Sequence, residues 1–215
     1  MSFQGWPEEA LDFYDGLEAD NSKAYWLAHK EIYETCVLAP MAELLAELEA
    51  EHGETKIYRP YRDVRFSKDK SPYKTAIGAH AGDGYIQLSA AGLAAGSGMY
   101  GMAPDQLERY RCAVATDSTG GALEEIIAEL GKLDIDVHGR DSLKTAPRGY
   151  SPDHPRVELL RYKGLVAWKE WPVEAWLGTP AARAAVADFL IASRPLGQWL
   201  TQYVRPSTEP ARARG

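Results

Sequence analysis

The sequence predicts an α+β fold, a mainly antiparallel sheet with helices packed on one face and at its ends. Helical and strand patterns occupy separate stretches of the chain instead of alternating, which is typical of this class. The strand patterns between residues 56 and 100 are joined by connections too short for a parallel crossover. With 215 residues, the chain fits a single domain over residues 1–204. We expect the polar segment 205–215, rich in Pro and Arg, to be a disordered tail.

Two helices are predicted at the start of the chain. The first begins at Pro7, carries two glutamates in its first turn and ends near Asp20. A longer helix follows, because apolar residues recur at spacings of three, four and seven from Trp26 to Leu48. Pro40 lies inside this pattern, so we expect a kink or a break there.

The next segment contains the predicted sheet. Residues 56–58 are a short strand candidate, and the strands 75–81 and 84–89 flank a Gly-Asp pair that predicts a hairpin. A further strand spans residues 93–100. In the rest of the chain we predict helices at 104–114, 122–132, 157–162, 179–192 and 195–204, strands at 134–138 and 165–171, and a surface loop at 145–155.

Two of these later helices have specific start signals. Ser118 or Thr119 is the predicted cap of the helix at 122–132, and Pro195 is predicted to start the last helix.

The composition restricts location and partners. The net charge of −7 argues against broad nucleic-acid binding, so nucleic acid is not a favoured partner. No stretch reaches the roughly 18 apolar residues of a membrane span, and no signal-peptide pattern is present. Cys36 and Cys112 lie far apart and are predicted to be buried, reduced thiols. We therefore expect a cytoplasmic protein without a membrane partner.

Positive charge is concentrated between residues 59 and 74, where six basic residues accompany only two acidic ones. Such a cluster predicts a pocket for phosphate or carboxylate. The candidate ligand-binding residues are Arg59, Arg62, Arg65, Lys70 and Lys74. The alternative is a network of Arg–Asp pairs that ties a long loop to the sheet.

Two residues of this stretch are candidates for proton transfer if the protein is an enzyme, which the sequence leaves open. They are Asp63 and Tyr73, and the neighbouring cations would then stabilise developing negative charge. In an extended backbone Asp63 and Arg65 lie on one face, so the carboxylate is expected to orient the guanidinium.

Two other sequence patterns could indicate a cofactor site or a metal site. Residues 96–101 spell GxGxxG, but antiparallel strands are the wrong context for a dinucleotide site, so we expect a strand that another backbone or a ligand approaches closely. Asp134, Asp136 and His138 alternate as metal ligands on a strand would, yet an exposed strand face shows the same alternation. We predict neither a cofactor nor a metal.

The run Arg-x-x-Arg-Asp-x-Arg-Phe-x-x-x-Asp-Lys-x-x-Tyr-Lys, here residues 59–74, resembles the signature of a bacterial family, the domain of unknown function 2461. Segments within 21–34, 98–107 and 146–155 resemble its other blocks, so the resemblance covers about residues 6–204. It also marks Phe66 and Asp69 as special positions, and it implies no activity.

The leading functional hypothesis is a cytosolic protein whose basic pocket binds a small anionic, phosphorylated ligand. The alternatives are an interaction module that docks on an acidic protein surface or structured nucleic acid, and a purely structural ion-pair cluster. The identity of the ligand and the oligomeric state do not follow from the sequence.

Overall fold

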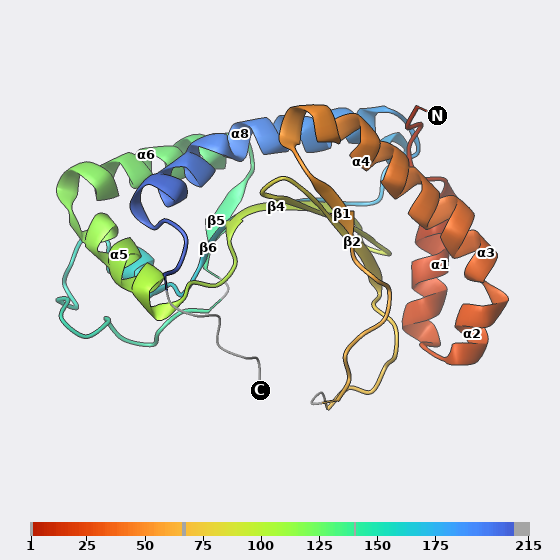
Figure 1. The fold of residues 1–215 in the computed structure, drawn as a ribbon, viewed down its shortest axis with the longest axis horizontal. Coiled ribbons are helices and arrows are strands. Elements are labelled where there is room, and N and C mark those ends of the chain that lie inside the picture. Colours follow the sequence, from red (N-terminus) through yellow and green to blue (C-terminus); the bar gives the residue numbers. More distant parts are fainter. Residues whose placement is uncertain (1, 66–67, 140, 209–215) are drawn as a thin grey trace. The chain divides into compact units, whose positions relative to one another are not determined.

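The computed structural model describes residues 2–65, 68–139 and 141–208, and within them it confirms the α+β class (Figure 1). Its strands are β1 (Thr55–Ile57), β2 (Ala76–Ala81), β3 (Gly84–Ser89), β4 (Gly92–Met99), β5 (Asp136–His138) and β6 (Leu165–Trp171). They form one sheet in the order β1-β2-β3-β4-β6-β5, and the described pairs β1–β2, β2–β3 and β5–β6 are antiparallel. The chain divides into two compact units, residues 1–95 with 170–189 and residues 96–169 with 190–215.

The first unit begins with helices. Helix α1 (Glu8–Ala19) matches its prediction, with Pro7 at its N-terminal cap. The predicted long second helix is instead divided into α2 (Lys23–Ala28), α3 (Lys30–Ile32), the π-helix η1 (Tyr33–Leu38) and α4 (Ala39–His52). Pro40 lies in the first turn of α4, where the π-helix passes directly into an α-helix: Leu38 and Ala39 keep helical backbone angles, so the helix type changes next to the proline without a break in the chain's helical path. A proline has no N–H to donate to the preceding turn, which explains why the helical register changes just before it.

The hairpin of β2 and β3 is formed as predicted, and its two faces differ. Side chains on one face are buried against α1 and α4, whereas those on the other face are only partly covered. The buried set comprises Ile77, Ala79, Ala81, Ile86 and Leu88 of the hairpin together with Leu44, Leu45 and Leu48 of α4. The period of two in the hairpin therefore places Ala76, Gly78, His80, Tyr85 and Gln87 on the opposite side, here called the outer face.

The second unit contains α5 (Pro104–Ala115), α6 (Asp117–Lys132), β5 and α7 (Val157–Arg161). The predicted start of α6 was wrong: the helix begins five residues earlier and its N-terminal cap is Thr116. Thr119 lies inside the first turn and donates its hydroxyl to the carbonyl of Ala113, 2.5 Å away. A hydroxyl that bonds back to an earlier carbonyl is compatible with a position inside a helix.

The last helix also differs from the prediction. A single helix α8 (Ala181–Tyr203) replaces the two that were expected, with Pro195 inside it. Apolar residues on both sides of the proline, among them Leu190 and Leu196, are buried. Burial along the whole helix outweighs the backbone hydrogen bond that the proline cannot make.

Both cysteines are free, as predicted, but neither is buried: Cys36 is partly covered and Cys112 is exposed. Each lies on the outward side of its helix, because the buried stripes of η1 and α5 pass through neighbouring residues.

The segment expected to be a disordered tail is partly held in place. Gln106 and Arg109 of α5 donate hydrogen bonds to the backbone carbonyls of Arg205 and Pro206. The Asp105 carboxylate accepts from the hydroxyl of Ser207 and the amide of Thr208. Residues 205–208 therefore pack on α5, and 209–215 lie outside the described residues.

A turn glycine gives a test of the hairpin. Gly82 has a φ of +55°, and a Cβ added to it would lie 2.0 Å from the carbonyl oxygen of His52. We expect Gly82→Ala to reduce the free energy of unfolding by roughly 2 kcal/mol in urea unfolding. The matched control is Gly121→Ala in α6, where a Cβ meets nothing within 4 Å. That change should stabilise the protein by about 0.5–1 kcal/mol, and equal midpoints for the two variants would contradict the turn geometry.

Candidate functional site

The basic stretch forms a loop that is closed at its base. Tyr61 and Tyr73 form an isolated antiparallel bridge. The amide of Arg62 donates to the carbonyl of Pro72 at 2.9 Å, and the amide of Lys74 donates to that of Pro60 at 2.8 Å. Phe66, which the family resemblance singled out, lies outside the described residues. The bridge fixes Arg62 and Lys74 on opposite sides of the loop's neck.

Tyr73 anchors this neck to the N-terminal helices. The side chain of Asn21 accepts from the Tyr73 amide at 3.0 Å and donates to the Tyr73 carbonyl at 3.1 Å. The Tyr73 ring stacks on Trp26 with 4.4 Å between centroids and 5° between planes. Burial raises the pKa of the Tyr73 hydroxyl, and only 5% of the residue is exposed. The structure therefore places this candidate proton-transfer residue in a packed aromatic cluster.

Two ion pairs lie inside the loop. Arg62 contacts Asp69, whose carboxylate also accepts from the amide and hydroxyl of Ser71. These hydrogen bonds, led by the Ser71 hydroxyl, hold the pKa of Asp69 well below its usual range. The acceptor geometry of Asp69 thus fixes the turn before Pro72.

The predicted pairing of Asp63 with Arg65 is confirmed. The guanidinium donates two hydrogen bonds to the carboxylate, from Nε at 2.9 Å and from a terminal nitrogen at 2.6 Å. The hydrogen bond from the Arg65 side chain is the main reason that the pKa of Asp63 falls to about 2. Asp63 is therefore an ionised carboxylate near neutral pH, which cannot act as a general acid there.

The other basic candidates are separated from one another. Lys70 donates to the backbone carbonyl of Val64 at 3.0 Å, so it supports the loop from within. Arg59 is exposed, and its positive charge contributes to the electrostatics of both Asp63 and Lys74. Two of the five predicted ligand-binding residues, Arg62 and Lys74, line one pocket formed by described residues.

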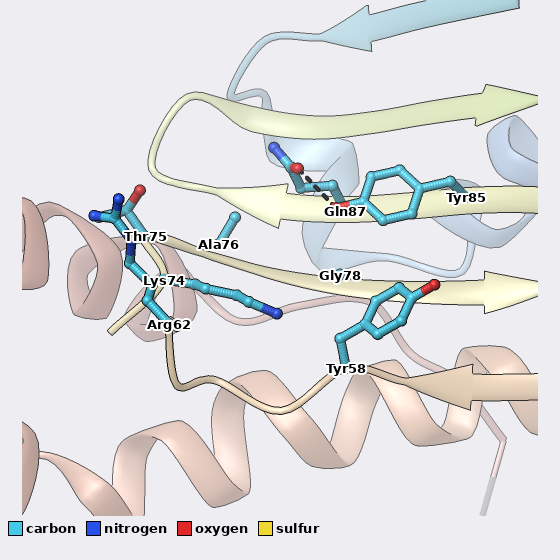
Figure 2. A pocket seen from close by; sticks show the side chains of 8 residues that line it. All are labelled: Tyr58, Arg62, Lys74, Thr75, Ala76, Gly78, Tyr85 and Gln87. Atoms are coloured by element: carbon cyan, nitrogen blue, oxygen red, sulfur yellow. Dashed lines mark hydrogen bonds between the residues drawn. The ribbon is translucent and has the colours of Figure 1, made fainter. Parts of the chain in front are cut away.

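This pocket has a volume of about 330 Å³ and lies on the outer face of the sheet (Figure 2). Its lining combines the two cations of the loop with residues of β2, β3 and the end of β1: Tyr58, Arg62, Lys74, Thr75, Ala76, Gly78, Tyr85 and Gln87. Ala76 and Gly78 have small side chains, which leaves room above β2. The sequence analysis did not identify Tyr58, Tyr85 or Gln87 as site residues. The alternation along β3 was the signal that could have placed Tyr85 and Gln87 on one face.

Lys74 is the cation at the centre of the pocket, with its side chain extending from the loop toward the ring of Tyr58 (Figure 2). Its ammonium nitrogen lies 5.4 Å from the Tyr58 ring centroid, a cation–π contact. Partial burial and then the charge of Arg59 lower the pKa of Lys74 from its ordinary 10.5. Within the described residues no carboxylate forms an ion pair with Lys74. Among the described residues, Arg62 therefore shares its charge with Asp69, whereas Lys74 contacts an aromatic ring and no carboxylate.

The two patterns outside the basic stretch have structural explanations. In the glycine-rich run, a Cβ on Gly98 would lie 2.4 Å from the backbone oxygen of Leu165, so the expected close backbone approach is confirmed. Asp134 lies before β5 with a φ of +58°, so it does not alternate with Asp136 and His138 on one strand as expected. Asp136 contacts Nδ1 of His138 at 2.8 Å, and the described residues contain no group of three metal-ligating side chains.

The fold and the pocket define a small α+β protein with a cationic site on the outer face of an antiparallel hairpin. Residues 9–199 match the family model described as conserved hypothetical protein (DUF2461), and the chain belongs to this family. No curated protein and no solved structure matches the chain. Among the described residues, no helix has the length and apolar character needed to cross a membrane.

Removing the anchor of the loop should open it. Asn21→Ala deletes both hydrogen bonds to Tyr73 and should lower the free energy of unfolding by about 1–3 kcal/mol. We also expect faster trypsin cleavage after Lys68 and Lys70, because the neck of the loop loses its attachment.

The control for this experiment is Ser22→Ala, which removes the side-chain cap of α2 at a cost of about 1 kcal/mol without touching the loop. Equal protection of the loop from trypsin in both variants, despite lower stability, would show that Asn21 does not anchor it.

Proposed function

We propose that the outer-face pocket binds a small anionic ligand, with a phosphate group between Lys74 and Arg62. The observation that carries this proposal is the half-buried Lys74 ammonium, which has no carboxylate partner among the described residues. Isolated charges are costly to remove from water, so a protein that keeps one in a pocket gains by binding a counter-ion there. A bound phosphate supplies that counter-ion.

The pocket offers several donors to a phosphate. Arg62 uses one terminal nitrogen for Asp69, and a guanidinium has further N–H groups in the same plane. Lys74 contributes up to three N–H donors, and Thr75 adds a hydroxyl at the edge of the pocket. Charge-assisted bonds from two cations favour phosphate over a neutral sugar.

Asp63 and Tyr73 hold structural positions in this proposal, as the partner of Arg65 and the anchor of the loop. The proposal is therefore one of ligand binding, and it assigns no group to proton transfer.

The ligand site is tested by exchanging one cation at a time. Binding of inorganic phosphate, sugar phosphates and small carboxylates to the wild-type protein is measured by isothermal titration calorimetry. Lys74→Met should weaken phosphate binding at least tenfold, because it removes a charge-assisted hydrogen bond. The matched control is Lys68→Met, which makes the same charge change in the same loop outside the pocket.

Three results would contradict the proposal. One is that no anion binds the wild-type protein. Another is that the two lysine variants weaken binding equally, which would indicate a diffuse electrostatic field. The third is that only acidic polypeptides or polynucleotides bind, with steep salt dependence and no effect of Lys74→Met, which would favour an interaction module.

The lowered pKa of Lys74 predicts how the affinity for phosphate changes with pH. Phosphate binds the protonated amine, so affinity should fall as the pH rises toward 10, earlier than for a lysine with the ordinary pKa of 10.5. A sugar phosphate is the ligand for this titration, because its second pKa of about 6 keeps it a dianion throughout this range. Lys74→Arg should remove the fall, since a guanidinium stays protonated above pH 12. Calorimetry between pH 7.5 and 10 measures both curves, and identical curves would exclude Lys74 as the titrating group.

A further inference from the structure

The pocket has an aromatic end as well as a cationic one. A Cβ added to Gly78 would lie 2.6 Å from the hydroxyl oxygen of Tyr85 and 3.1 Å from two of its ring carbons. The phenol end of Tyr85 therefore lies directly over β2, where only glycine leaves it room. Tyr85 also lines the pocket, together with Tyr58 and Gln87 (Figure 2).

This ring is held in a defined orientation. The Tyr85 hydroxyl donates to Oε1 of Gln87 at 3.0 Å. Tyr58 and His80 contact the ring at centroid distances of 6.4 and 5.7 Å, at interplanar angles of 38° and 66°. The amide nitrogen of Gln87 carries two further donors that can reach the edge of a ligand beside the ring. A fixed ring with a neighbouring amide is suited to a flat heterocycle.

The cationic and aromatic ends belong to one cavity, with Tyr58 between them. Tyr58 contacts Lys74 on one side and Tyr85 on the other. The volume of about 330 Å³ is at the lower end of the roughly 300–1,000 Å³ of small-molecule sites. It therefore suits a ligand with one base and one phosphate group better than a dinucleotide.

We propose that the pocket takes a nucleoside monophosphate, whose base stacks on Tyr85 beside Gln87 while its phosphate lies between Lys74 and Arg62. This inference rests on the proposed anion site and adds the chemical class of the ligand. Stacking of a base on an aromatic side chain is tolerant of base identity, so the four common bases should bind with similar affinity.

The experiment compares ligands that contain one or both parts. Inorganic phosphate, ribose 5-phosphate, adenosine and the four nucleoside monophosphates are titrated into wild-type protein and the variants Tyr85→Leu, Tyr85→Phe and Lys74→Met. We expect the nucleotides to bind wild type at least tenfold more tightly than ribose 5-phosphate. Tyr85→Leu should remove this preference and leave the affinity for ribose 5-phosphate unchanged, while Tyr85→Phe should retain it. Lys74→Met should weaken the nucleotides and ribose 5-phosphate alike.

Each contrary result shows whether the nucleotide inference, the anion site or both are wrong. Equal affinity of nucleotides and ribose 5-phosphate, with both dependent on Lys74, would overturn the nucleotide inference and leave the anion site intact. Failure of every anion to bind would overturn both. Binding of an eight-nucleotide single strand more than a hundredfold tighter than its mononucleotide would show that a strand, and not a mononucleotide, is the ligand.

A second measurement uses only the wild-type protein, so its result does not depend on whether a variant folds. In saturation-transfer NMR of the wild-type protein with adenosine monophosphate, the base protons should receive the strongest transfer, because they contact the ring. Transfer confined to the ribose protons would overturn the proposal.

Discussion

The attachment of Tyr73 to the N-terminal helices is the constraint on which the site depends. Two hydrogen bonds with the Asn21 side chain and the stack on Trp26 hold this one residue by its backbone and its ring. The bridge between Tyr61 and Tyr73 then fixes both sides of the basic loop. Arg62 and Lys74 each directly follow a residue of the bridge, so the anchor at Tyr73 also fixes where their backbones lie. The stretch 59–74 therefore contains both the anchored residue, Tyr73, and the cations that it positions.

The two faces of the β2–β3 hairpin have different roles in the first unit. Apolar residues such as Ile77 and Leu88 bury one face against helices and supply the hydrophobic stabilisation. On the outer face, Gly78 provides the space into which Tyr85 folds. The same strand thus contributes to the core through its odd-numbered residues and to the pocket through its even-numbered ones.

The charges of the basic stretch are not equivalent. Asp69 neutralises part of Arg62, Asp63 pairs with Arg65, and Lys70 bonds to a backbone carbonyl. An internal ion-pair network therefore describes part of the stretch, and the proposed ligand pocket concerns Arg62 and Lys74. Lys74 is set apart by its partial burial beside the Tyr58 ring, which no charge count reveals.

The sequence by itself determined the fold class, the hairpin at residues 76–89 and the pairing of Asp63 with Arg65, because periodicity and short-range contacts act between near neighbours. It also identified the family through residues 59–74. Only the tertiary structure decided that Tyr58, Tyr85 and Gln87 share a pocket with Lys74, since β1 and β3 are joined through β2 and not through local sequence. The same limit explains Pro195, where burial of the flanking residues overrides a local helix-start signal. Local preferences amount to about 1–3 kcal/mol, and burial in the folded core is large enough to reverse them.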